Sequence, residues 1–69
     1  MDNLELEKTL ITQLNSRQVI DLEMYPNTIL RPLESKKYIY VSRNEQGKVV
    51  SINRGKRFID AVEKYIRNL

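Results

Sequence analysis

Residues 33–59, LESKKYIYVSRNEQGKVVSINRGKRFI, decide the fold of this chain. The arms at residues 38–43 and 48–53 are rich in β-branched and aromatic residues, which favour strands. The connection between them ends in Gly47, which can supply the positive φ that such four-residue connections usually need. We therefore predict a β-hairpin. Because two isolated strands are marginally stable in water, the hairpin must pack against helices.

Helical patterns lie at both ends of the chain. Asp2 or Asn3 can cap a first helix that ends near Asn15, with one apolar stripe formed by Leu4, Leu10, Ile11 and Leu14. Asn53 is a plausible cap for a last helix over residues 56–69. Its apolar face would contain Phe58, Ile59, Val62, Tyr65, Ile66 and Leu69.

The segment at residues 16–24 is ambiguous. Ser16 can cap a helix, and Val19, Ile20 and Glu23 would then share one side. Strand periodicity fits slightly better, because Ile20, Leu22 and Met24 alternate with acidic residues. The neighbouring helix and hairpin favour the helical interpretation.

A turn signal at residues 25–28 precedes a candidate short helix over residues 28–37, with Ile29, Leu30 and Leu33 facing inward. Pro32 opposes this helix, since an interior proline lacks a backbone donor and clashes with the preceding turn. We expect the helix either to bend or to begin near Arg31.

Length and composition indicate one small soluble domain. The chain has 69 residues, of which 41% are hydrophobic, and contains neither Cys nor His. It is too apolar for a disordered tail, and its N-terminus lacks the layout of a signal peptide. We expect a single domain over residues 1–69 in the cytoplasm, with no membrane segment.

Charge divides the chain into two parts. Residues 1–23 hold two basic and five acidic side chains, a net charge of −3, whereas residues 31–57 hold eight basic and two acidic ones, a net charge of +6. A basic surface attracts a polyanion such as nucleic acid. The alternative is a solvated surface without a partner.

Enzymatic chemistry has little support. Without His or Cys there is no thiol nucleophile and no common general base to activate a serine. Gly47 and Gly55 do not have the spacing of a phosphate-binding loop. We expect no enzyme activity, no metal and no cofactor.

Candidate DNA-binding residues surround the predicted short helix and the hairpin. Asn27, Thr28 and Arg31 suit base edges, and Lys36, Lys37, Arg43, Asn44, Lys48, Arg54 and Arg57 suit the backbone. Tyr38 and Tyr40 share one side of their strand and would either stack on bases or cover the edge of the core.

Residues 27–62 resemble the winged-helix regulators of the MarR and PadR type. The residues that carry this resemblance are Leu30–Ile39, then Arg43–Ile52, then Arg54–Ile59. The resemblance implies a supporting helix at residues 16–24, a recognition helix at 27–36 and a wing tip at 43–48. Lys37 stands where the family usually has glycine, Asn53 where it has threonine, and Pro32 lies inside the recognition helix.

We therefore predict an α+β winged helix-turn-helix with three helices, a two-stranded wing and a C-terminal helix, minimal and without the family's dimerisation helices. Such a protein would bind double-stranded DNA as a transcription regulator or an excision or architectural factor, as small phage or plasmid proteins do, and would form a homodimer. The alternative is a protein-interaction module with strands at residues 17–25, 28–33, 38–43 and 48–53, which would bind or inhibit a protein partner.

Overall fold

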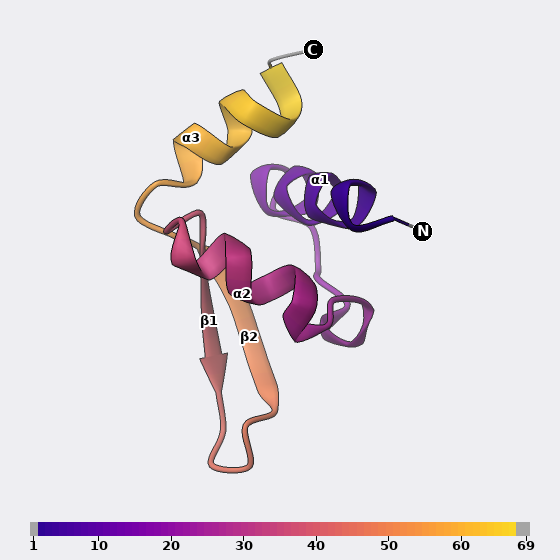
Figure 1. The fold of residues 1–69 in the computed structure, drawn as a ribbon, viewed down its shortest axis with the longest axis vertical. Coiled ribbons are helices and arrows are strands. Elements are labelled where there is room, and N and C mark those ends of the chain that lie inside the picture. The colour runs from indigo at the N-terminus through magenta and orange to yellow at the C-terminus, as the bar shows by residue number, and fades with distance from the viewer. Residues whose placement is uncertain (1, 68–69) are drawn as a thin grey trace.

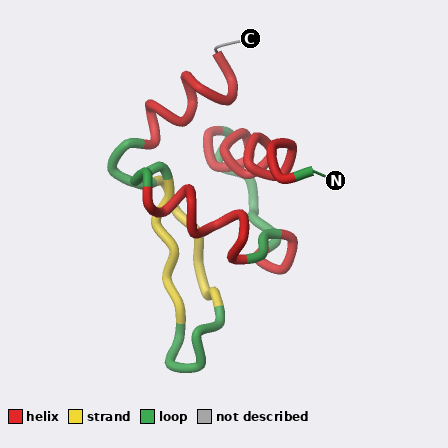
Figure 2. The backbone as a smooth tube through the Cα atoms, viewed as in Figure 1, coloured by secondary structure: helices red, strands yellow, loops and turns green. Residues whose placement is uncertain are grey.

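A computed structural model describes residues 2–67 as three α-helices and a two-stranded antiparallel sheet (Figures 1 and 2). The elements follow in the order α1 (Asn3–Asn15), the 3₁₀ turn η1 (Leu22–Met24), α2 (Asn27–Ser35), β1 (Ile39–Arg43), β2 (Val49–Arg54), α3 (Phe58–Val62) and the π-helical η2 (Glu63–Arg67). Among these residues no helix has the length and apolar character to cross a membrane.

The first helix forms as its sequence predicts. Asp2 is the N-cap, and its Oδ1 accepts a hydrogen bond of 2.8 Å from the backbone N–H of Glu5. At the other end Arg17 adopts a left-handed φ of 58°, and the N–H of Gln18 donates to the carbonyl of Gln13. This pattern is a Schellman motif, which ends helices by satisfying their last carbonyls.

Both predictions for residues 16–24 are wrong as to secondary structure. The segment is neither an α-helix nor a strand, and only Leu22–Met24 forms a turn of 3₁₀ helix, capped by Asp21. Its alternating apolar residues Ile20, Leu22 and Met24 still pack against the core from irregular backbone. The four-strand meander is therefore absent from the described residues, and so is the supporting α-helix expected at residues 16–24, between α1 and α2.

The short helix α2 contains Pro32 in its interior and begins at Asn27, so the expected start near Arg31 is wrong. Proline cannot donate to the carbonyl of Thr28 four residues earlier. Thr28 is exposed, and water can therefore replace the missing donor. The opposite face of the helix holds Ile29, Leu30 and Leu33, all fully buried.

The hairpin is confirmed. Val41 pairs with Ile52, a β-bulge interrupts the register between Ser42 and Arg43, and Gly47 has a φ of 81° at the tip. Helix α2 lies across one face of the hairpin (Figure 1), and Ile39 and Ile52 are buried.

The chain continues from β2 into the last helix through Gly55. A Cβ atom at Gly55 would lie 2.5 Å from the carbonyl oxygen of Lys37 and 2.8 Å from the nitrogen of Ile39, so only glycine fits there. Asn53 does not cap the helix as expected, because it lies within β2 and Arg57 is the N-cap. Ile59 is 73% exposed rather than buried, and Leu69 lies outside the described residues.

One hydrophobic core joins the three helices and the hairpin. Two tyrosines tie its rim to α1: the hydroxyl of Tyr25 donates to Oε1 of Gln13 at 2.7 Å, and the hydroxyl of Tyr65 donates to Oε1 of Glu7. Burial raises the pKa of both tyrosines, and the neighbouring Glu7 carboxylate raises that of Tyr65 further. Both phenols are therefore protonated donors at neutral pH.

Candidate nucleic-acid interface

The outer face of α2 is polar. Helical periodicity buries Ile29, Leu30 and Leu33, and it leaves the residues of the opposite side exposed, namely Asn27, Thr28, Arg31, Pro32 and Ser35. Three of the predicted base-contacting residues therefore share one helix face. The only acidic residue of this helix is Glu34, at the border between the two faces.

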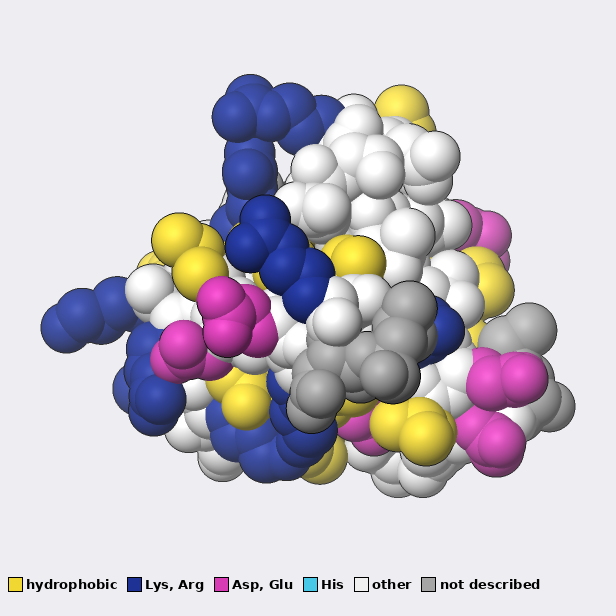
Figure 3. Space-filling view, turned by 90° about the horizontal axis from the view of Figure 1, so that it is seen from above, with side chains coloured by type: hydrophobic (Ala, Val, Ile, Leu, Met, Phe, Trp, Pro, Cys, Tyr) yellow, Lys and Arg dark blue, Asp and Glu magenta, His cyan; other side chains and the backbone are white. Residues whose placement is uncertain are grey.

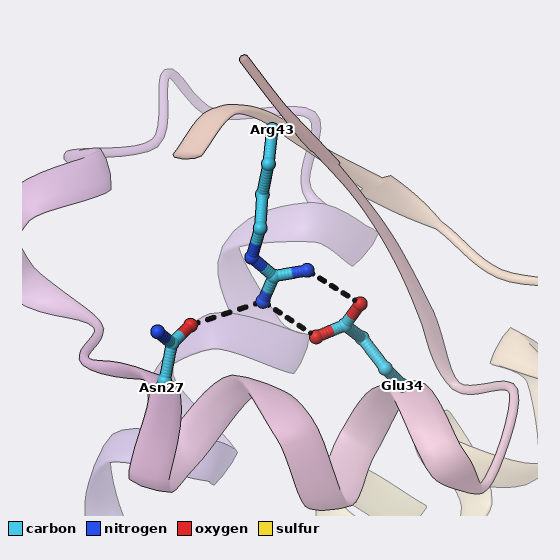
Figure 4. Close-up of polar contacts among 3 residues, drawn as sticks. All are labelled: Asn27, Glu34 and Arg43. Atoms are coloured by element: carbon cyan, nitrogen blue, oxygen red, sulfur yellow. Dashed lines mark hydrogen bonds and ion pairs between the residues drawn. The ribbon is translucent and has the colours of Figure 1, made fainter. Parts of the chain in front are cut away.

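Arg43 binds this helix instead of projecting from the hairpin (Figure 4). Its Nη1 donates to Oε1 of Glu34 at 3.0 Å, and its Nη2 donates to Oε2 of Glu34 at 2.8 Å and to Oδ1 of Asn27 at 3.0 Å. A fork-like, two-bond contact of this kind is the strong geometry for arginine and carboxylate. We call these three residues the Arg43 clasp.

The Arg43 clasp fixes the hairpin to both ends of α2. The side chain of Arg43 is 15% exposed and that of Glu34 is 23% exposed. The hydrogen bonds from Arg43 hold the pKa of Glu34 below its ordinary value. The predicted role of Arg43 as a phosphate contact at the wing tip finds no support in this geometry, because its guanidinium is already occupied within the protein.

The two candidates at the hairpin tip, Asn44 and Lys48, have different roles. Oδ1 of Asn44 accepts hydrogen bonds from the backbone N–H groups of Gln46 at 3.0 Å and Lys48 at 2.9 Å, so this side chain shapes the turn. Lys48 is exposed, and its side chain forms no hydrogen bond or ion pair among the described residues. Lys48 is therefore the cation that the tip can offer to a phosphate.

The C-terminus of α2 holds two adjacent exposed lysines. Lys37 has a φ of 65°, and the N–H of Tyr38 donates to the carbonyl of Leu33, which makes a second Schellman motif. This left-handed position explains why a glycine is favoured there. The ammonium of Lys36 lies 5.9 Å from the ring centre of Tyr38.

Arg54 is the last residue of β2, and Arg57 is the N-cap of α3. The guanidinium of Arg54 lies 5.8 Å from the ring centre of Phe58, and Nε of Arg57 donates to Oδ2 of Asp60 at 2.8 Å. The side chains of Arg57 and Asp60 are 62% and 53% exposed. Exposed pairs of this kind are weak, so a phosphate can compete for Arg57.

The two tyrosines of the first arm have different surroundings. Tyr38 precedes β1 and meets Tyr65 edge to face, with ring centres 6.3 Å apart, so it covers the edge of the core. Tyr40 is 66% exposed and lies opposite Asn53 in the ladder.

Positive side chains gather on one side of the molecule. Figure 3 shows most of the visible Lys and Arg side chains on the left, with acidic side chains both among them and on the right. The sequence did not indicate Arg17, which lies at the end of α1 yet shares a surface groove with Arg54 and Asn53. Only its left-handed position, invisible in the residue pattern, brings it toward the hairpin.

Comparisons of the chain with protein-family models, with curated proteins and with solved structures found no match.

Proposed function

We propose that this protein binds double-stranded DNA without catalysis, as a small transcription regulator or an accessory factor in excision or DNA architecture. The outer face of α2 enters the major groove, and the hairpin lies along the neighbouring backbone. A helix followed by a two-stranded hairpin is consistent with the layout of a winged helix, which the sequence resembles in residues 27–62, although the supporting helix expected at residues 16–24 is absent from the described residues.

One observation carries the proposal: the face of α2 that points to solvent presents positive charge that no neighbouring carboxylate neutralises. Arg31 is exposed on this face. Glu34, the only acidic residue of the helix, has both carboxylate oxygens bonded to Arg43. The Arg43 clasp therefore pairs the only carboxylate of α2 with a cation, and another acidic side chain on this side is Glu23, which lines a groove with Asn27 and Lys48.

The dimensions of α2 suit this task. An α-helix with its side chains is about 10–12 Å across, and the major groove is about 12 Å wide. Thr28 in the first turn is a short polar side chain of the kind that reads base edges. Asn27 accepts from Arg43 through Oδ1 only, so its Nδ2 group can still donate to a base.

Backbone contacts come from exposed cations around the helix and hairpin, namely Lys36, Lys37, Lys48, Arg54 and Arg57. If only three of them neutralise phosphates, the logarithm of the affinity falls with the logarithm of salt concentration with a slope of about −2.7. Over a fourfold rise in salt, that slope weakens binding by roughly 40-fold.

Fluorescence anisotropy with a labelled 20-base-pair duplex, titrated at several salt concentrations, tests the proposal. We expect a slope of about −2.7 or steeper for the unaltered protein. Lys48→Gln reduces the steepness by about 0.9, whereas the matched control Lys8→Gln, on α1, leaves the slope unchanged. A flat salt dependence, or equal effects of Lys48→Gln and Lys8→Gln, refutes the proposal.

A further inference from the structure

A second groove runs between α2 and β1, apart from the hairpin tip. It has a volume of about 460 Å³, and the polar part of its lining comes from Arg31, Glu34, Ser35, Lys37 and Tyr40. It brings two cations and an exposed aromatic ring to one place.

The cations of this groove have no free carboxylate as a neighbour within it. Glu34 is the one acidic residue in the lining, and Arg43 binds both of its carboxylate oxygens. The groove therefore presents net positive charge from Arg31 and Lys37. A phosphate group is complementary to such a site.

Strand alternation leaves Tyr40 on the exposed face of β1. Tyr25 and Tyr65 are buried with hydrogen-bonded hydroxyls, and Tyr38 packs against Tyr65, but the ring of Tyr40 is 66% exposed. It stands on the face of β1 opposite to the buried Ile39. Because Tyr40 lines the same groove as Arg31 and Lys37, its ring can offer apolar surface to the sugar that accompanies a phosphate.

Lys37 occupies its position at a conformational cost. A left-handed backbone is unfavourable for residues other than glycine, and φ at Lys37 is 65°. The fold alone would favour glycine here. A lysine at this position is consistent with a role for its charge in the groove.

We propose that the α2–β1 groove binds one nucleotide unit of the DNA backbone. Arg31 and Lys37 hold the phosphate, and the ring of Tyr40 packs against the deoxyribose. This inference rests on the proposed function and changes it in one respect: Arg31 becomes a backbone contact, and base readout is left to the first turn of α2.

The same anisotropy assay tests the groove, with two duplexes of unrelated sequence. Lys37→Gln reduces the steepness of the salt dependence by about 0.9 on both duplexes. Lys37→Gly removes the same charge and relieves the left-handed backbone, so an equal loss of slope in both variants assigns the effect to charge. Arg31→Ala weakens binding to both duplexes alike.

Tyr40→Ala weakens binding about tenfold without a change of slope, and Tyr40→Phe retains the affinity. Because Tyr40 and Lys37 are exposed, these variants fold, and circular dichroism verifies this. If the unaltered protein binds with a steep slope but the Lys37 and Tyr40 variants match Lys8→Gln, the groove inference is wrong and the proposed function stands. Tighter binding of a 20-nucleotide single strand than of the duplex, lost in Tyr40→Ala, also overturns it.

Discussion

Arg43 gives the sharpest prediction, because its position in the sequence and its position in the structure imply different roles. As a wing-tip cation, Arg43 would contribute one phosphate contact, and Arg43→Gln would reduce the salt slope by about 0.9. In the structure the side chain of Arg43 is 15% exposed, and its guanidinium donates three hydrogen bonds to Glu34 and Asn27. No phosphate contact is then lost, and we expect a slope within about 0.2 of the unaltered value.

The affinity itself should still fall in Arg43→Gln. Without its partner, Glu34 presents an uncompensated carboxylate on the helix that faces DNA, and the hairpin loses its attachment to α2. The double variant Arg43→Gln with Glu34→Gln removes both charges, and so it recovers most of the lost affinity. The interaction term of this double-mutant cycle measures the coupling directly.

The pKa of Glu34 provides a readout independent of DNA. In the folded protein this pKa lies below its ordinary value of 4.5, with the hydrogen bonds from Arg43 as the main cause. The pair therefore stabilises the fold at pH values above 4.5, and the contribution is lost as pH falls through the folded-state pKa. NMR titration of the Glu34 side chain should show the pKa rising in Arg43→Gln. A loss of slope of about 0.9 together with an unchanged pKa of Glu34 would refute the Arg43 clasp.

Three further predictions concern the fold and its assembly. Gly55→Ala costs about 2–3 kcal/mol of unfolding free energy, because its Cβ would meet fixed backbone 2.5 Å away. Gly47→Ala costs about 1 kcal/mol, because Gly47 has a φ of 81° but open space around it. Equal losses of unfolding free energy in urea denaturation would contradict the close backbone contact at Gly55. Because Tyr25 and Tyr65 have raised pKa values, their contribution to the unfolding free energy is complete below about pH 10 and decreases as pH rises further. Tyr65→Phe should therefore flatten the fall in stability at alkaline pH. A pH profile identical to that of the unaltered protein would argue against the hydrogen bond from Tyr65 to Glu7. Exposed Val19, Val50 and Ile59 offer apolar surface to a second copy, so we expect a dimer in sedimentation at micromolar concentration; monomer alone would oppose it.

The elements with strong local signals were predictable from the sequence. The first helix has a capping aspartate and an apolar stripe, and the hairpin has two β-branched arms around a glycine. These signals depend on a few neighbouring residues. The prediction for residues 16–24 was wrong because the Schellman turn at Arg17 and the proline at position 26 leave only a short segment between them. The conformation of this segment is set by its contact with the core and not by its own periodicity.

The role of Arg43 could have been found from the sequence. Strand alternation places residue 43 on the same face as Ile39 and Val41, which is the face that must pack on a helix. A cation at that position needs a carboxylate on the facing helix, and Glu34 is the only acidic residue there. The exposure of Tyr40 follows from the same alternation. What alternation does not give is the left-handed backbone of Lys37, which sets the position of this lysine beside the α2–β1 groove.

Backbone amide shifts, followed while a DNA duplex is added to the ¹⁵N-labelled protein, locate the binding surface residue by residue. We expect the shifted amides to lie in the first turns of α2, at Arg31, at Lys37, on β1 and at Lys48. The amides of α1 between Glu5 and Thr12 should stay unchanged. Shifts confined to α1, or no shifts at DNA concentrations in excess of the protein, would contradict the claim that α2 and the hairpin form a DNA-binding surface.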